Sequence, residues 1–172
     1  MQEKYHSEKI QKKQLHQSYN FLLLRKIFRN SMTTNEIQDA IIEEFSIFDD
    51  WLDKYQYIID LAKELPHIAP EHKTEQNTIK GCQSKVWLFA ELQDGKVIFT
   101  ADSDAVITKG IIALLVRIFS NQTPADILNT DLYCIEKIGL KENLSPTRSN
   151  GLVAMIKQMK LYATAFQYKQ QH

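Results

Sequence analysis

The sequence is poor in cysteine, has no net charge and lacks a long apolar run. Its 172 residues include only two cysteines, Cys82 and Cys134, too few to staple a small secreted domain with disulfides. Two cysteines also cannot hold a four-ligand zinc ion without help from His or carboxylate ligands. The longest apolar stretches, residues 21–24 and 110–116, are far shorter than a membrane span. No signal-peptide cleavage pattern follows an apolar core. We therefore expect a cytoplasmic protein in a reducing setting, with no membrane partner.

The charge balance gives little reason to expect a nucleic-acid partner. Basic and acidic residues number 21 each, so the formal net charge is zero. The charges are unevenly spread, because residues 1–31 carry seven basic and two acidic side chains. The length suits one domain with a sizeable core. We predict an N-terminal extension over residues 1–31 and a single domain over residues 32–172.

The basic extension has three readings that the sequence leaves open. It contains a short apolar cluster between Phe21 and Phe28 among Gln, Lys and His residues. An additional amphipathic helix, a poorly ordered tail and an organelle-targeting segment would all have this composition. Met32 is a plausible natural start, because patterned sequence follows it directly.

Helical signals dominate both ends of the domain. Thr33 with Glu36 fits a capping box, and Pro66 ends a second helix with a broad apolar face. The segment Asp102-Ser103-Asp104 has the acidic residues that favour a helix start, and Gly110 inside that helix predicts close packing. The first predicted helix starts at about residue 34. The others cover residues 49–65, 102–119, 125–129, a short segment ending at Gly139, and 151–168, with loops at 66–78 and 145–150.

The middle of the domain is β-like. Residues 86–92 and 96–100 are rich in Val, Ile, Phe and Trp, and Asp94-Gly95 between them predicts a hairpin turn. Residues 77–81 are a candidate third strand. The order of elements predicts an α+β fold, with a small antiparallel sheet of about three strands and helices mainly on one face.

Cys82 is the most informative residue, because Gly81, Gln83 and Ser84 surround it with small or polar neighbours. From the residues alone, it is either a reactive loop thiol or a buried structural cysteine. Loop amides, the nearby Lys80 and Lys85, or an Arg distant in sequence would favour the reactive thiolate. Cys134, between Tyr133 and Ile135, is read as a core residue.

Several further motifs follow one another along roughly residues 35–160. The central one is Gly81-Cys82-Gln83-Ser84-x-Val86-Trp87. The others are Tyr55-x-Tyr57-Ile58-Ile59-x-Leu61, Leu65-Pro66, Asp102-Ser103-Asp104-Ala105 before Lys109-Gly110, Thr123-Pro124 before Ile127, and Leu144-Ser145-Pro146-x-Arg148-Ser149-x-Gly151. Together and in this order, these motifs resemble the SufE family of sulfur acceptors, in which Ser is more usual than Thr at position 147. The fold implied is SufE/IscU-like.

The resemblance implies a role as sulfur acceptor and activator of a cysteine desulfurase. That enzyme uses pyridoxal phosphate, and the cofactor belongs to the enzyme rather than to this chain. Cys82 would take the sulfur as a transient persulfide and pass it to an iron–sulfur scaffold complex. No metal and no resident cofactor are expected, and the protein would be an accessory in sulfur relay rather than a free-standing enzyme.

The remaining site residues have alternative readings. Arg148 contacts the desulfurase by resemblance, or is a charge at the helix surface. Asp104 is a helix cap, or holds the Cys82 segment closed. Gln83 and Ser84 shape the loop backbone, and Gly81 permits its movement. Trp87 and Phe89 are read as packing residues, and His67 and His72, near the loop in sequence, are the candidates for a general base.

Two other functions remain open at this point. One is an iron–sulfur assembly scaffold, for which two cysteines are too few to supply ordinary cluster ligands. The other is an independent cysteine-dependent enzyme, which would need a base beside the thiol. None of the five histidines lies in a recognisable catalytic motif.

Overall fold

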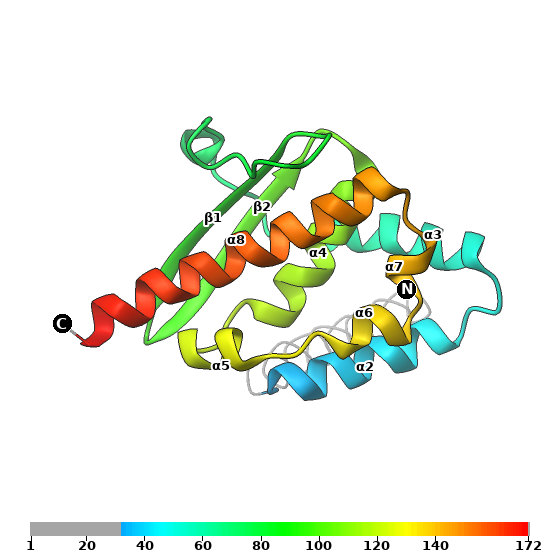
Figure 1. Ribbon diagram of the computed structural model, residues 1–172, viewed down its shortest axis with the longest axis horizontal. Coiled ribbons are helices and arrows are strands. Elements are labelled where there is room, and N and C mark those ends of the chain that lie inside the picture. The colour runs from blue at the N-terminus through cyan, green and yellow to red at the C-terminus, as the bar shows by residue number, and fades with distance from the viewer. Residues whose placement is uncertain (1–31, 172) are drawn as a thin grey trace, which may run out of the picture. The chain divides into compact units, whose positions relative to one another are not determined.

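The computed structural model describes residues 32–171, and the predictions for residues 1–31, including the domain boundary, lie outside these residues. These residues form an α+β fold of helices and a two-stranded sheet (Figure 1). The helices are α2 (Thr34–Ser46), α3 (Trp51–Leu61), α4 (Val106–Phe119), α5 (Pro124–Asn129), α6 (Tyr133–Lys137), α7 (Leu140–Asn143) and α8 (Pro146–Gln171), with short 3-10 turns η1 (Ala62–Glu64) and η2 (Pro70–His72) and strands β1 (Val86–Gln93) and β2 (Lys96–Ser103).

The sheet is an antiparallel hairpin, as predicted, but the predicted third strand at residues 77–81 does not form. Asp94 and Gly95 both have positive φ angles, which suits the tight turn of a two-residue hairpin. Residues 77–79 add only a single bridge to β1, where the Ile79 N–H donates to the Val86 carbonyl at 2.8 Å. Strand β2 instead runs three residues further than predicted, through Ser103.

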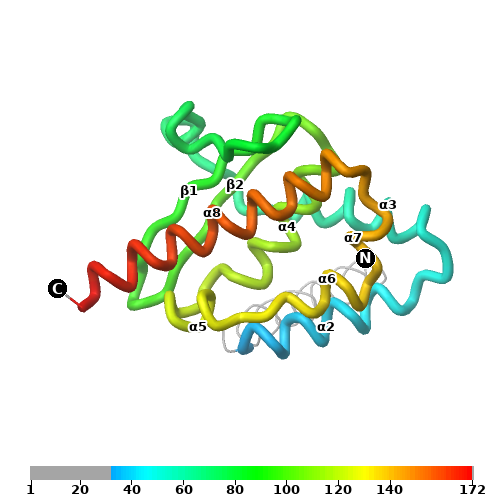
Figure 2. Tube along the Cα trace, viewed as in Figure 1, coloured from blue at the N-terminus to red at the C-terminus, as the bar shows by residue number. Residues whose placement is uncertain are grey.

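Helices α4 and α8 pack on one face of this sheet, which confirms the predicted layering (Figure 2). Alternate strand residues such as Leu88, Val97 and Phe99 are fully buried on that face. The Tyr162 hydroxyl of α8 donates to the Leu88 carbonyl at 3.2 Å. The opposite face carries Phe89, on which the His72 ring stacks from the segment 66–78.

Helix α4 is the centre of the core, and it contacts β2 and the helices α2, α3 and α8. Its Gly110 confirms the predicted close packing, because a Cβ atom there would lie 2.1 Å from the carbonyl oxygen of Ile58 on α3. The helix begins at Val106, so the prediction that it starts at Asp102 is wrong. Its N-cap is Ala105, and no side chain caps it.

The other helix ends follow their local signals, with one exception. The capping box of Thr33 and Glu36 is present, Asp50 caps α3, and Thr123 caps α5 ahead of Pro124. Gly139 follows α6 with a φ of 74°, as a C′ glycine should. The exception is the predicted loop at 145–150, because α8 already begins at Pro146, a position that suits the first turn.

Candidate functional site

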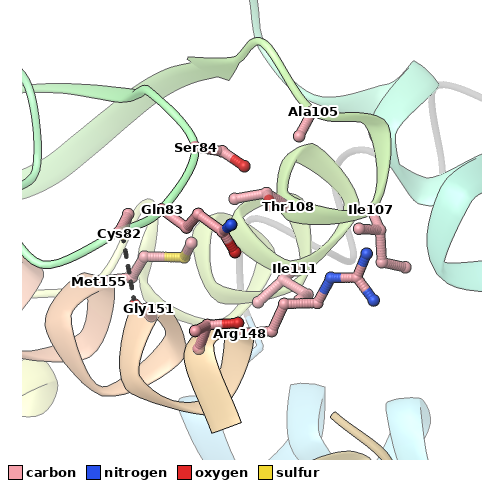
Figure 3. A pocket seen from close by; sticks show the side chains of 11 residues that line it. Cys82, Gln83, Ser84, Ala105, Ile107, Thr108, Ile111, Arg148, Gly151 and Met155 are labelled. Carbon is pink, nitrogen blue, oxygen red and sulfur yellow. Dashed lines mark hydrogen bonds between the residues drawn. The ribbon is translucent and has the colours of Figure 1, made fainter. Parts of the chain in front are cut away.

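A cavity of about 80 Å³ lies beneath the loop that carries Cys82 (Figure 3). Three segments far apart in sequence form its walls: the loop itself, the first turns of α4 and the first turns of α8. Its lining residues are Cys82, Gln83, Ser84, Ala105, Ile107, Thr108, Ile111, Thr147, Arg148, Gly151 and Met155. The volume leaves room for a few water molecules beside the thiol. The structure thus brings Gln83, Ser84 and Arg148 to the same cavity as Cys82.

The Cys82 thiol is half-buried and faces α8. Its Sγ donates a weak hydrogen bond to the Gly151 carbonyl at 3.7 Å, shown as the dashed line in Figure 3. Burial raises the pKa of the Cys82 thiol, because a low-polarity environment disfavours the thiolate. The prediction that loop amides and nearby lysines favour the thiolate is therefore wrong for this position of the loop. Lys80 instead pairs with Glu75 at the surface.

Residues 80–84 are called here the Cys82 loop, and the residues that flank it, Ile79 and Lys85, are its upstream and downstream bases. Hydrogen bonds to the sheet hold both bases, whereas few hydrogen bonds are made within the loop. Upstream, Ile79 is bonded to Val86 of β1. Downstream, Lys85 is bonded to the junction between β2 and α4. Within the loop, the hydrogen bonds among residues 32–171 are the Lys80 pair with Glu75 and the Cys82 contact with Gly151. Gly81 has a φ of 91°, which a side chain would disfavour.

The downstream base is a clamp made by Ser103 and Asp104. The Lys85 N–H donates to Asp104 Oδ1 at 3.0 Å, and the Asp104 N–H donates to the Lys85 carbonyl at 3.2 Å. The Ser103 hydroxyl donates to the same carbonyl at 2.9 Å. Asp104 therefore does not cap α4, and of its two readings the contact with the Cys82 segment is the one that its geometry fits.

Arg148 is exposed in the first turns of α8 and is directed away from the thiol. Its Nη1 donates to the Tyr55 hydroxyl of α3 at 2.6 Å. Figure 3 shows the guanidinium beyond Ile111, while Met155 lies beside Cys82. The guanidinium therefore presents a positive charge at the rim of the cavity without acting on the sulfur atom directly.

Seven lining residues were not predicted as site residues from the sequence: Ala105, Ile107, Thr108, Ile111, Thr147, Gly151 and Met155. A signal existed in their spacing, since residues 148, 151 and 155 share one face of α8 and residues 108 and 111 share one face of α4. Gly151 lies directly against the thiol, where a Cβ atom would be at an ordinary contact distance of 3.5 Å from Sγ. Without knowing which helix lies under the loop, the spacing could not be read as a cavity wall.

The other candidate residues lie outside this cavity. Cys134 is fully buried in α6 and burial raises its pKa to about 12, so its reading as a core residue is confirmed. His72 stacks on Phe89, and neither histidine of segment 66–78 is among the lining residues. Within residues 32–171, no group of three or more His, Cys, Asp or Glu side chains is arranged to hold a metal ion. No helix in this described part of the chain is long and apolar enough to cross a membrane.

Comparison with known proteins decides the family. The sequence profile of SufE, described as the Fe-S metabolism associated domain, matches residues 39–163. The chain belongs to the SufE family. An uncharacterised SufE-like protein of Rhizobium etli is 41% identical over 127 residues, covering 71% of this chain and 86% of the relative. Another, from Rhizobium meliloti, is 39% identical over 127 residues, covering 71% and 91% respectively.

A solved structure shows the same fold. The solution structure of a hypothetical protein from Thermus thermophilus matches with a TM-score of 0.66 and 21% identity, covering 80% of this chain and 99% of that one. The family match includes the Cys82 loop and every residue that lines the cavity. Membership of the SufE family associates this protein with iron–sulfur metabolism.

Proposed function

We propose that this protein accepts sulfur on Cys82 from a cysteine desulfurase, which it activates, and relays that sulfur to an iron–sulfur scaffold complex. The observation that carries the proposal is the placement of one half-buried thiol on a lightly held loop above a small cavity. Membership of a family associated with Fe-S metabolism supports it. On this proposal the protein is an accessory, and the pyridoxal phosphate belongs to the desulfurase.

The transfer needs only one thiol on this chain. The Cys82 thiolate attacks the terminal sulfur of a persulfide on the desulfurase, the old sulfur–sulfur bond breaks, and a new one forms on Cys82. The desulfurase cysteine leaves as a thiolate and takes up a proton, so no external oxidant or reductant is consumed. A second thiol in the cavity would convert the persulfide to a disulfide and release sulfide. The lining residues include no second cysteine.

The resting position of Cys82 suits storage better than attack. The thiol is sheltered, and burial raises its pKa, so it is mostly protonated at neutral pH. Attack therefore requires the loop to leave the cavity when the desulfurase docks. After transfer, the cavity can shelter the persulfide from oxidants and reductants. Gly81, with its positive φ, would be the hinge of this movement.

The other site residues have supporting roles in this proposal. Asp104 holds the downstream base of the loop through Lys85. Arg148 offers an exposed cation at the cavity rim, held in place by Tyr55, for contact with the desulfurase. Gln83 and Ser84 line the cavity and define the loop backbone.

Sulfur transfer can be measured directly by mass spectrometry. The protein is mixed with a cysteine desulfurase and cysteine, then analysed without reductant. We expect mass steps of about 32 Da per sulfur atom on the peptide that contains Cys82. Cys82→Ser should abolish the mass gain and the stimulation of the desulfurase.

Cys134→Ser is the matched control, because Cys134 is buried in α6 and lies outside the cavity. It should leave both the mass gain and the stimulation intact. Sulfur addition to Cys134, or an unchanged mass gain in Cys82→Ser, would show that the acceptor has been assigned wrongly.

A further inference from the structure

The carboxylate of Asp102 makes ion pairs with one residue upstream and one residue downstream of the Cys82 loop in the sequence. Asp102 lies near the end of β2, opposite Trp87 of β1. Its Oδ1 pairs with Lys109 Nζ at 2.8 Å, and its Oδ2 pairs with Lys73 Nζ. The side chains of Asp102, Lys109 and Lys73 are 18%, 27% and 38% exposed, so solvent screens them only in part.

The pair with Lys109 spans the turn that clamps the loop. Asp102 precedes this turn, Lys109 follows it in the first turn of α4, and Ser103 and Asp104 lie between them. Asp102 Oδ1 also accepts the Ser103 N–H at 2.9 Å. The carboxylate therefore fixes both ends of the short segment that is bonded to Lys85.

The ion pair with Lys73 attaches the segment that precedes the Cys82 loop to β2. Lys73 Nζ also lies 5.7 Å from the centre of the Trp87 ring, within range of a cation–π contact. The side-chain amide of Asn77 donates to the His72 carbonyl at 2.8 Å, and the Asn77 carbonyl accepts the Leu88 N–H at 2.9 Å. These contacts attach the segment between His72 and Asn77 to β1, two residues before Ile79, the upstream base.

We propose that Asp102 is a positioning residue that limits the opening of the Cys82 loop, by holding both loop bases on the sheet through Lys73 and Lys109. With both bases fixed, only residues 80–84 can move. Release of either base lengthens the mobile segment and makes departure from the cavity easier. The inference rests on the proposed function only in giving Cys82 its role, since opening can be measured without a partner protein.

The ionised state of Asp102 is secure near neutrality. Burial opposes ionisation, but hydrogen bonds from Lys109 and Lys73 outweigh it and lower the pKa of Asp102 to about 2. The contacts should therefore respond to ionic strength rather than to pH in the neutral range.

The test is the alkylation rate of Cys82 by iodoacetamide, followed by peptide mass spectrometry on the full chain. Asp102→Asn keeps the side-chain size and removes the charge. We expect roughly a fivefold or greater rise in rate. The matched control is Asp60→Asn, which removes a carboxylate paired with Lys63 at 2.6 Å on the surface of α3, and it should leave the rate unchanged.

Two readouts separate loop opening from a simple charge effect on the thiol. Rates measured across pH should show a higher alkaline plateau in Asp102→Asn, whereas a charge effect alone would only move the midpoint. Raising the salt from about 0.01 M to about 1 M shortens the screening length from roughly 30 Å to 3 Å. This change should speed alkylation of the wild-type protein and leave Asp102→Asn nearly unaffected.

The proposal is wrong if the alkylation rate of Asp102→Asn stays within about twofold of that of Asp60→Asn, which is the usual scatter for surface changes. Should circular dichroism show that Asp102→Asn does not fold, Lys73→Gln and Lys109→Gln each remove one ion pair. Each should then give a smaller rise, and no rise in either would overturn the proposal. Since the assay contains no desulfurase, a failure of sulfur transfer would leave this result intact.

Discussion

At the scale of single residues, the two cysteines differ in what surrounds their sulfur atoms. Cys82 is half-buried on a lightly held loop, whereas Cys134 is fully buried on α6, where that helix packs against α2. Burial raises the pKa of both thiols, and that of Cys134 reaches about 12. Only the Cys82 thiol can become accessible through a local movement, because Cys134 would need the core to open.

This difference predicts the labelling of the folded protein. Alkylation of Cys82 should rise with pH to a midpoint above the ordinary cysteine value of about 8.5, because the thiolate is disfavoured in the cavity. Cys134 should remain unlabelled over the same time and serve as the internal control. Peptide mass spectrometry measures both sites in one sample.

In denaturant, the two cysteines should label at similar rates with an ordinary midpoint. A midpoint for Cys82 at or below that of the unfolded chain would contradict a sheltered resting thiol. It would mean that the loop is mostly open, or that a cation faces the sulfur.

The sequence identified Cys82 and its neighbours but not the environment of the thiol. Its short polar motif predicted a loop, and the structure has one. The contact that sets the thiol's environment is with Gly151, 69 residues further along the chain. The sequence predicted that Lys80 favours the Cys82 thiolate, yet Lys80 pairs with Glu75. Long-range packing, which no local pattern encodes, decides the pKa.

At the scale of elements, two glycines sit inside helices for different steric reasons. Gly110 of α4 lies against the α3 backbone, and a Cβ atom there would come within 2.1 Å of the Ile58 carbonyl. Gly151 of α8 faces Cys82, where a Cβ atom would lie at an ordinary contact distance of 3.5 Å from Sγ. The first position has no room for a methyl group, and the second has.

Alanine at these two positions should have different effects on stability. Gly110→Ala must push α3 and α4 apart and should lower the free energy of unfolding by about 3 kcal/mol or more. Gly151→Ala should change it by little, or raise it by up to about 1 kcal/mol through better helix propensity. Denaturant unfolding at neutral pH measures both. Equal effects at the two positions would show that the α3–α4 approach is looser than described.

Element boundaries were predictable where capping residues mark them. Thr33, Asp50, Thr123 and Gly139 all lie where their chemistry suggests. The acidic run at 102–104 was misread as a helix start, because strand pairing extends β2 through Ser103 opposite Val86. The polar run at 145–150 was misread as a loop, although Pro146 is a good first helical residue.

At the scale of the whole described domain, one polar cluster joins three helices. Glu44 of α2 accepts hydrogen bonds from Arg117 of α4 at 2.6 and 2.7 Å, and from the Tyr57 hydroxyl of α3 at 2.7 Å. This cluster and the apolar core around α4 tie the helices together. The same core positions the first turns of α4 under Cys82. The stability of the domain and the shape of the cavity therefore depend on the same packing.

Tyr57 gives this cluster a pH dependence whose sign is clear. Burial and the hydrogen bond to Glu44 raise the pKa of Tyr57 to about 12, above the unfolded value of about 10. A group whose pKa is raised by folding contributes stability that is fully present below its unfolded pKa. That contribution is lost as pH rises through the folded pKa. The Tyr57 contribution should therefore decline between about pH 10 and pH 12.

Tyr57→Phe tests this dependence through guanidinium unfolding at neutral pH and at about pH 11, near the raised tyrosine pKa. Between the two, the wild-type protein should lose more stability than the variant, whatever the variant's stability at neutral pH. The variant should still lose some stability at high pH, because two other groups titrate there in both proteins. Hydrogen bonding to Asp39 raises the pKa of Tyr133 to about 12, and burial raises the pKa of Cys134 similarly. Equal losses in both proteins would mean that Tyr57 titrates alike in the folded and unfolded chains, and that its bond to Glu44 does not join α2 to α3 in solution.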